Sequence, residues 1–303
     1  MSEKYLISIV GPTAIGKTSL SITLAQHFNA EIISSDSRQF FKEMQIGTAA
    51  PNSSELQAAK HHFIHHKSVE DDYSVGAFEK DAIKTLTKLF LNRDVVIMVG
   101  GSGLYVDAVT CGLDEFPKVD KNIRISLNAQ LIANGIETLQ SQLKHLDEET
   151  YNKIALNNPQ RIIRALEICI GTGKPYSSFL KKSKINRNFK VLTVGLTADR
   201  EIIYERINKR VDIMMEQGLL EEVKTLKPKA HLNALNTVGY KELFNYLEKE
   251  WTLNFAVSEI KKNSRRFAKR QLTWFKRREE TLWFNYDTKH ETIISEIEST
   301  IKA

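Results

Sequence analysis

The chain has 303 residues, a length that predicts about two domains and a core large enough to need no disulfide staples. Hydrophobic residues make up 42% and charged residues 26%, which excludes a wholly disordered chain. The formal net charge is +6. Residues 261–278 hold nine lysines and arginines and no acid, so the rest of the chain has 34 basic against 37 acidic residues. A concentrated basic segment on a mildly acidic chain predicts a polyanionic partner.

The cysteines and the apolar runs exclude further classes of protein. Cys111 and Cys169 are far apart and form no CxxC pair, which argues against a disulfide framework or a cysteine-based zinc site and indicates a reducing compartment. The apolar run Tyr5–Val10 is too short for a signal peptide, and no stretch approaches the length of a membrane span. We therefore expect a cytoplasmic protein with no membrane partner. Nothing indicates an obligate dimer, so we expect a monomer.

The first hundred residues alternate short apolar strands with amphipathic helices. Strands are expected at 5–10, 31–34 and 95–99, and helices at 17–28 and 75–91, the second beginning after an N-cap at Ser74. Apolar strands separated by helices predict a parallel sheet that is covered on both faces.

The pattern between residues 118 and 187 is helical only. Helices are expected at 121–133, 136–145 and 159–170, followed by a GTGKP turn and a basic stretch at 181–190. Strand character returns at 191–196, and later helices are interrupted by a short strand near 282–284. We therefore expect one α/β domain of residues 1–117 and 188–303 with an inserted helical subdomain of residues 118–187.

Residues 11–18 read GPTAIGKT, a full match to the phosphate-loop pattern GxxxxGK[ST] between a predicted strand and a predicted helix. Glycines let backbone N–H groups turn toward a phosphate, and the helix N-terminus adds partial positive charge. Lys17 would reach the terminal phosphate, and the Thr18 hydroxyl would ligate Mg²⁺. The predicted fold is thus a P-loop NTPase-like parallel sheet flanked by helices. The candidate diphosphate-binding residues are Gly11, Pro12, Thr13, Ala14, Ile15, Gly16, Lys17 and Thr18.

One feature of phosphate-loop ATPases is missing. These enzymes place an acid at the end of a second apolar strand to hold Mg²⁺, but residues 95–99 run into Gly100-Gly101-Ser102. The nearest acid is Asp36, after the strand expected at 31–34, and the carboxyl ends of parallel strands face the ligand crevice. Asp36 would therefore face the phosphate loop and assist a metal or act as a general base. Alternatively, it only caps a helix, because a helical-looking stretch follows it.

Further blocks of sequence extend the pattern over almost the whole chain. They are GPTAIGKT (11–18), IISSDSRQFF (32–41), IGTAAP (46–51), VGGSGLY (99–105), NPQRIIRALEI (158–168), RINKRVDIMMEQGLLEEV (206–223), VGYKE (238–242) and RRFAKRQLTWFKR (265–277). With these blocks in this order, the sequence resembles the tRNA dimethylallyltransferases (isopentenyl-diphosphate:tRNA transferases). No cysteine-containing zinc finger is found near the C-terminal end, which resembles the bacterial type.

The resemblance implies transfer of a dimethylallyl group from dimethylallyl diphosphate to N6 of adenine 37, beside the anticodon. The tRNAs concerned read codons that begin with uridine. Asp36 would take a proton from the amino group, which is a poor nucleophile by itself. Thr13, Lys17 and Mg²⁺ would stabilise the departing diphosphate, and by resemblance Arg210 is the arginine on this leaving group. No phosphate is hydrolysed as an energy source, which accounts for the missing acid after residues 95–99.

The resemblance also implies contacts with the anticodon arm of tRNA. The matching positions are Asp36, Ser37, Arg38, Gln39, Ser102, Arg124, Gln160, Arg161, Ile162, Ile163 and Arg164. Arg161 and Arg164 share a helix face at i, i+3, so both can meet phosphates, although Glu167 nearby allows a plain ion-pairing surface instead. The adenine must leave its stack to reach Asp36, so base flipping is implied.

The basic segment 261–278 has helical spacing. Lys262, Arg266, Lys269, Arg270 and Arg277 gather on one side, and Ile260, Phe267 and Trp274, seven apart, are expected to form an apolar stripe. Nine charges without an acid among them would repel, which disfavours a merely solvated face. A membrane-surface helix is a second alternative, but Trp274 and Phe275 are expected to pack on the core. We therefore predict that this segment, including Lys269 and Arg270, binds the phosphate backbone of tRNA.

Several residues depart from the family pattern or suggest other chemistry. Phe41, Ala50 and His65 stand where the family usually has tyrosine, lysine and aspartate. The histidines His61, His62, His65 and His66 could suggest zinc, but they have no neighbouring cysteine and no HExxH pattern, which favours packing or surface roles.

Two other functions compete with a tRNA prenyltransferase. A small-molecule or nucleotide kinase shares the phosphate loop but gives no reason for the basic helix. A non-catalytic RNA-binding protein explains the basic helix but leaves the pairing of the phosphate loop with Asp36 without a role.

Overall fold

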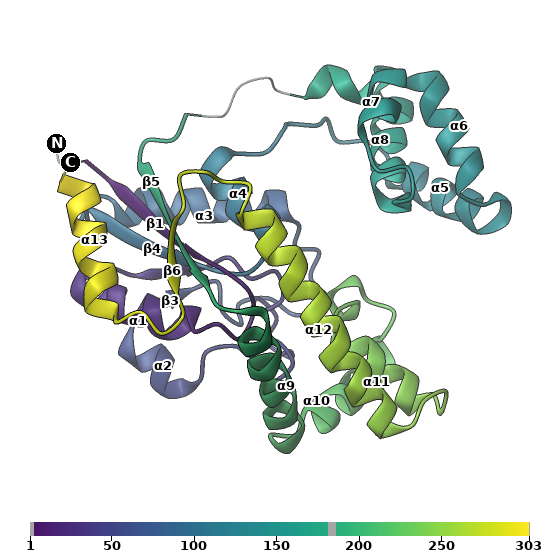
Figure 1. Cartoon of the computed structure of the whole chain (residues 1–303). Coiled ribbons are helices and arrows are strands. Elements are labelled where there is room, and N and C mark those ends of the chain that lie inside the picture. Colours follow the sequence, from purple (N-terminus) through teal and green to yellow (C-terminus); the bar gives the residue numbers. More distant parts are fainter. Residues whose placement is uncertain (1–2, 181–185, 303) are drawn as a thin grey trace. The chain divides into compact units, whose positions relative to one another are not determined.

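The computed structural model describes residues 3–180 and 186–302 (Figure 1). The chain divides into two compact units: a core unit, Met1–Cys111 with Asn186–Ala303, and a helical unit, Gly112–Ile185. The sequence predicts an insert of residues 118–187, so both boundaries of the helical unit fall earlier in the chain. The first half of the basic stretch 181–190 lies outside the described residues.

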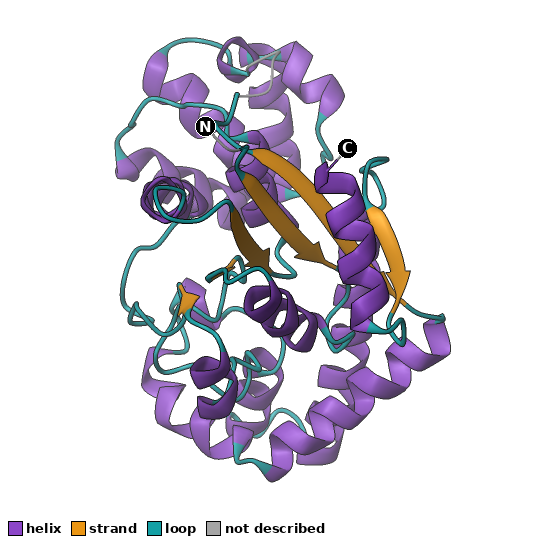
Figure 2. Cartoon of the chain, turned by 90° about the vertical axis from the view of Figure 1, so that its left-hand side faces the viewer, coloured by secondary structure: helices purple, strands orange, loops and turns teal. Residues whose placement is uncertain are grey.

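The core unit is built on a six-stranded parallel sheet, as the sequence predicts (Figure 2). The strand order is β3-β2-β4-β1-β5-β6. The strands are β1 (Tyr5–Val10), β2 (Ile32–Ser34), β3 (His61–His62), β4 (Val95–Val99), β5 (Lys190–Thr197) and β6 (Leu282–Asn285). Strand β1 is central and buried along its whole length, which explains its unbroken apolar run.

Helices cover both faces of the sheet, and the side chains of β1 alternate between them. Ile7 and Ile9 pack with α1 (Lys17–His27) and α13 (His290–Lys302). On the other face, Leu6 and Val10 pack with α3 (Val75–Leu89) and α4 (Gly103–Cys111). The carboxyl ends of β1, β2 and β4 therefore lie together at one edge of the sheet.

A second apolar cluster of the core unit joins the loop after β2 to four helices. These are α9 (Arg200–Glu216), α10 (Leu219–Leu226), α11 (Tyr240–Leu247) and α12 (Leu253–Phe275). Phe41 and Met44 of the loop are buried against Tyr240 and Leu243 of α11. This cluster fixes α9 and α12 beside the sheet edge. The remaining short elements of the unit are α2 (Ser53–Ala58), η2 (Lys227–Lys229) and η3 (Asn233–Leu235).

The helical unit has its own small core. Its elements are α5 (Lys121–Asn134), α6 (Ile136–Leu146), α7 (Glu148–Lys153), α8 (Pro159–Thr172) and η1 (Tyr176–Phe179). Leu127, Leu139, Leu143 and Leu166 meet in its centre with almost no exposed surface. Within the described part of the chain, no helix is both long and apolar enough to span a bilayer.

The alternative that Asp36 caps a helix is wrong. No helix follows Asp36; residues 35–50 form turns and bends. The Asp36 carboxylate accepts hydrogen bonds from the backbone N–H groups of Arg38 (2.9 Å) and Gln39 (3.4 Å), which closes an Asx turn. Asp36 thus accepts backbone N–H bonds as a capping residue would, but it stabilises a turn and not the start of a helix.

Candidate active site

The phosphate loop leaves β1 and enters α1 through two glycines with positive φ, Gly11 (143°) and Gly16 (112°). A Cβ at Gly11 would lie 2.5 Å from the carbonyl oxygen of Leu196, so the neighbouring strand also requires glycine there. Gly16 is the N-cap of α1 and offers no side-chain hydrogen bond, which leaves the amides at the helix start for an anion.

The Lys17 ammonium lies inside this loop. It donates to the carbonyl oxygens of Pro12 (2.7 Å) and Gly11 (3.1 Å). Burial, reinforced by the nearby Arg210 cation, lowers the pKa of Lys17 to about 7, while the Asp36 carboxylate acts in the opposite direction. The protonation of this lysine is therefore sensitive to charges that enter the site.

Two arginines of α9 reach the loop. Arg210 donates to the Thr13 hydroxyl oxygen at 3.0 Å, and the Arg206 Nε donates to the Ala14 carbonyl oxygen at 2.8 Å. The residues are four apart, so one helix face carries both guanidinium groups. This wall of the site holds Lys17 and Arg210 beside one another, an arrangement that favours a ligand with at least two negative charges.

Gln271 of α12 is a site residue that the sequence reasoning missed. Its side chain is 5% exposed. Its Oε1 accepts from the Thr13 backbone N–H, and its Nε2 donates to the Gly101 carbonyl oxygen, both at 2.9 Å. The sequence does not show that Gln271 points inward, because it lies in the basic segment, whose cations are expected to face solvent.

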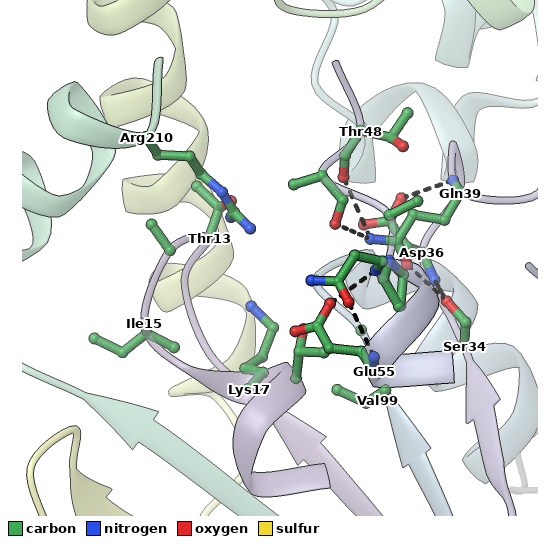
Figure 3. Close-up of a pocket in the computed structure, with 18 of the residues that line it drawn as sticks. Thr13, Ile15, Lys17, Ser34, Asp36, Gln39, Thr48, Glu55, Val99 and Arg210 are labelled. Carbon is green, nitrogen blue, oxygen red and sulfur yellow. Dashed lines mark hydrogen bonds between the residues drawn. The ribbon is translucent and has the colours of Figure 1, made fainter. Parts of the chain in front are cut away.

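Asp36 lies on the opposite wall of the same cavity from Lys17 and Arg210 (Figure 3). Both backbone donors of its turn bind Oδ1, and no hydrogen bond from the described residues reaches Oδ2. The next residues are also held: the Ser37 N–H donates to the Ser102 hydroxyl oxygen at 3.0 Å, and the Gln39 amide donates to the carbonyl oxygens of Thr48 (3.3 Å) and Ala49 (3.2 Å). The Asp36 carboxylate is thus held in place through Oδ1, while Oδ2 stays available for a substrate.

Glu222 of α10 holds the loop of residues 45–47 by hydrogen bonds, and it is a second residue that the sequence reasoning missed. Its carboxylate accepts from the N–H groups of Gln45 (3.0 Å), Ile46 (2.7 Å) and Gly47 (3.0 Å). The Tyr240 hydroxyl donates to the same carboxylate at 2.6 Å. Burial and this carboxylate raise the pKa of Tyr240 far above its ordinary value. Charge-assisted bonds of this kind fix the loop wall of the cavity.

The cavity between these walls has a volume of about 810 Å³, which is in the range of small-molecule and cofactor sites. All of its lining residues belong to the core unit. Apolar side chains such as Met214 and Phe267 line it together with the charged groups. The cavity can therefore hold an apolar group attached to an anionic one.

The sequence matches a known family over most of its length. The model of the IPP transferase family matches residues 39–278. The chain is 60% identical to the tRNA dimethylallyltransferase of Flavobacterium johnsoniae over 99% of both chains, and 61% identical to that of Christiangramia forsetii over the same shares. The chain belongs to the IPP transferase family.

Solved structures of family members have the same fold. The tRNA isopentenylpyrophosphate transferase of Bacillus halodurans is 37% identical, with a TM-score of 0.73 over 99% of this chain and 96% of that one. A eukaryotic dimethylallyltransferase captured acting on tRNA is 26% identical, with a TM-score of 0.80 over 94% of this chain and 75% of that one. Both the expected family and its P-loop NTPase-like fold are confirmed.

Helix α12 differs in two ways from the prediction for the basic segment. Phe267 is 38% exposed and lines the cavity, because the buried stripe instead follows Ala256, Ile260, Ala268, Gln271 and Phe275. A seven-residue spacing drifts around a straight helix by only about 20° per heptad, so Ile260, Phe267 and Trp274 point in similar directions, but Ile260 meets the apolar cluster whereas Phe267 meets the open cavity. Phe275 packs in the core and Trp274 packs against it, as expected.

The basic segment is also less repulsive than its sequence suggests. Lys261 pairs with Asp212 at 2.6 Å, Lys262 pairs with Glu259, and Arg278 pairs with Asp107. Acids outside the segment therefore neutralise three of its cations. Arg266, Lys269 and Arg270 remain exposed and form the basic face of α12, and Lys276 and Arg277 are exposed just beyond the end of the helix. The Arg270 guanidinium lies over the Phe267 ring, 5.7 Å from its centroid.

In the helical unit, Glu167 joins the positions expected to contact tRNA. It pairs with Arg124 at 2.7 Å and with Arg164 at 3.0 Å, so the ion-pairing alternative describes Arg164 in this structure. The side chains of Ile162 and Ile163 are fully buried in the core of the unit, which leaves only their backbone groups for the expected contact with RNA. Gln160 and Arg161 are exposed at the start of α8.

His62, His66 and Phe41 have packing or hydrogen-bonding roles, whereas Ala50 lies at the cavity. His61 and His62 lie in β3 instead of a helix, His62 bonds Glu31 at 2.7 Å, and His66 packs edge-on against Phe40. No cluster of three potential metal ligands occurs among the described histidine, cysteine and acidic residues. Phe41 is 4% exposed, so the departure from tyrosine lies in a buried cluster, whereas Ala50 lines the cavity.

Proposed function

We propose that the cavity of the core unit is the active site for the family reaction. The enzyme transfers a dimethylallyl group from dimethylallyl diphosphate to N6 of adenine 37 in tRNA and releases diphosphate. The observation that carries this assignment is the placement of Asp36 opposite Lys17 and Arg210 in one cavity (Figure 3). The reaction needs a base beside the adenine N6 and an anion site beside the departing diphosphate. This cavity has a carboxylate on one wall and cations on the other.

The wall formed by the phosphate loop and α9 stabilises the leaving group. As the bond between the allylic carbon and the diphosphate oxygen breaks, negative charge accumulates on the diphosphate. Lys17, Arg210 and the amides at the start of α1 supply positive charge at that place, and Thr13 is held there by Arg210. Diphosphate binding would also raise the pKa of Lys17 from about 7 and keep the ammonium charged.

The Asp36 wall activates the acceptor. The lone pair of the adenine N6 forms the new bond to the allylic carbon, and the carboxylate accepts the proton that N6 loses. The Asx turn holds Oδ1, so Oδ2 is the oxygen directed to the substrate. A fixed carboxylate of this kind contributes general-base catalysis without reorganisation during the reaction.

Mg²⁺ is proposed as the metal partner of the diphosphate. The Thr18 hydroxyl at the start of α1 is an oxygen ligand of the type that Mg²⁺ accepts, and Asp36 and Glu55 also line the cavity. Few protein ligands are needed because Mg²⁺ usually keeps waters and phosphate oxygens around it. When bound, the ion would neutralise charge on the departing diphosphate.

The tRNA is proposed to bind through its anticodon arm. The basic face of α12 would contact phosphates, while Ser37, Arg38, Gln39 and Ser102 surround the target nucleotide. The exposed start of α8 and the arginines Arg124 and Arg164 would add contacts from the helical unit. Adenine 37 would leave its stack to reach Asp36. We further propose that the enzyme works as a monomer in the cytoplasm, where its tRNA is found.

One assay tests this function against its rivals. Purified protein is incubated with undermodified tRNA and radiolabelled dimethylallyl diphosphate, with a tRNA that has guanine at position 37 as the matched control. Label on the adenine-containing tRNA alone is expected. ATP turnover with a small acceptor and no label on tRNA would indicate a kinase, and tRNA binding without transfer of label would indicate a binding protein.

A further inference from the structure

Gln271 joins two loops that leave neighbouring strands. Thr13 follows β1 and Gly101 follows β4. The Gln271 Oε1 accepts from the Thr13 N–H, and its Nε2 donates to the Gly101 carbonyl oxygen. The side chain is 5% exposed; its bond to Gly101 is buried and its bond to Thr13 is partly buried. A buried amide with both ends satisfied has one defined orientation, which makes it a rigid link.

The Gln271 side chain leaves no room for a Cβ at position 101. A Cβ added to Gly101 would overlap the Gln271 Nε2, and it would lie 4.0 Å from the Lys17 ammonium. Gly101 does not have a positive φ, so the backbone itself would accept alanine. The contact with Gln271 is therefore what requires glycine, and the same contact lies beside the lysine of the phosphate loop.

Only an amide side chain suits both partners. A glutamate at position 271 would accept from the Thr13 N–H but could not donate to the Gly101 carbonyl unless it were protonated. A methionine of similar size would leave the buried Gly101 carbonyl and the partly buried Thr13 N–H without this partner, and an unpaired buried group costs more than its bond contributes. Neither of these side chains reproduces the link.

We propose that Gln271 is a positioning residue for the transfer reaction: its amide sets Thr13 and the phosphate loop relative to Gly101 and β4. This inference rests on the proposed function, because the loop it sets is the proposed diphosphate site. Arg210 holds the Thr13 side chain from α9, and Gln271 holds the Thr13 backbone from α12. Thr13 is thus fixed from two helices.

The test compares Gln271→Met and Gln271→Glu with Thr273→Ala, an exposed control on the same helix. For Gln271→Met, a fall of about 10- to 100-fold in kcat/KM for dimethylallyl diphosphate is expected, with tRNA affinity unchanged, because a displaced loop misaligns the reacting groups. Gln271→Glu should recover part of the loss, because its carboxylate can still accept from the Thr13 N–H. Wild-type kinetics in both variants would overturn the proposal.

A second pair of variants remains informative if Gln271→Met does not fold. Gly101→Ala should lower kcat/KM, and Gly101→Ala combined with Gln271→Ala should recover part of it because the overlap is removed. Strictly additive effects of the two substitutions would contradict the link. Calorimetric binding of inorganic diphosphate, measured on all variants, separates the two levels of inference: wild-type protein that binds no diphosphate would refute the proposed function, whereas weakened binding only in the variants supports the role of Gln271.

Discussion

The Arg210 guanidinium donates to the Thr13 hydroxyl at 3.0 Å, although the two residues are 197 positions apart in the sequence. The bond ties α9 to the phosphate loop and brings a second cation beside Lys17. Burial lowers the pKa of Lys17 and the nearby Arg210 cation adds to this effect, whereas an incoming diphosphate would act in the opposite direction. The wall is therefore organised to meet an anion, and the opposite wall holds the only other charged group assigned a chemical step, Asp36.

Replacing Asp36 with asparagine should abolish transfer while preserving the site. Asparagine retains an oxygen that can accept from the Arg38 and Gln39 N–H groups, so the Asx turn survives. We expect kcat to fall by about 10²- to 10⁴-fold, the usual contribution of a general base, with tRNA affinity unchanged. Single-turnover transfer and filter binding measure the two quantities. Full transfer by Asp36→Asn would remove Asp36 from the base role.

The affinity for diphosphate should depend on the charge of Lys17. Its pKa of about 7 means that the free site loses the ammonium charge as the pH rises through that value, so binding must then recover a proton. The ligand gains charge over a similar range, and Lys17→Arg, which stays charged, corrects for this. We expect the ratio of wild-type to Lys17→Arg dissociation constants, measured by calorimetry, to increase above pH 7. A ratio independent of pH would show that Lys17 is charged throughout.

Removing exposed cations from α12 should weaken tRNA binding and its salt dependence. Lys269→Ala with Arg270→Ala should reduce the slope of log K against log salt by about one for each phosphate that the variant no longer neutralises. Lys302→Gln removes an exposed cation from α13 and is the matched control. Nitrocellulose binding between low and moderate salt provides the slopes. Equal slopes for the double variant and wild type would place the tRNA elsewhere.

Glu167→Gln should change stability and tRNA affinity in opposite directions. The substitution removes the charge that pairs with Arg124 and Arg164, so it should destabilise the helical unit by about 1–3 kcal/mol. The same change frees two cations and should tighten tRNA binding at low salt. Urea unfolding and tRNA binding measure the two effects. Weaker tRNA binding by a folded Glu167→Gln variant would mean that the pairing itself presents the arginines correctly.

Weakening the grip of Glu222 should loosen the loop wall of the cavity. Glu222→Gln leaves three backbone N–H groups and the Tyr240 hydroxyl with a poorer, uncharged acceptor, and a loss of about 1–3 kcal/mol in unfolding free energy is expected. Tyr240→Phe removes only one of these bonds and should cost less. Thermal and urea unfolding compare the two variants. A larger loss for Tyr240→Phe would show that packing of the ring, not the carboxylate, holds the loop.

Local patterns in the sequence were sufficient for the phosphate loop, the alternating strands and helices, and the family. GPTAIGKT needs only neighbouring residues to form its anion site. An unbroken apolar run such as Tyr5–Val10 indicates a strand that is buried on both faces. The position of Asp36 followed from a general property of parallel sheets, that their carboxyl ends share one edge. These features depend on spacing within a few residues or on topology.

Contacts between distant segments were decided only by the tertiary structure. Gln271 and Glu222 act through backbone groups of remote loops, and a backbone partner leaves no mark in the sequence of either segment. The pairing of basic-segment cations with Asp107 and Asp212, and of Glu167 with two arginines, likewise depends on which helices pack together. The sequence alone thus determined the phosphate loop and the parallel sheet, because short-range geometry encodes them, and its motif blocks identified the family and the reaction by resemblance. Which cations stay free for tRNA and which residues hold the site rigid were settled by packing.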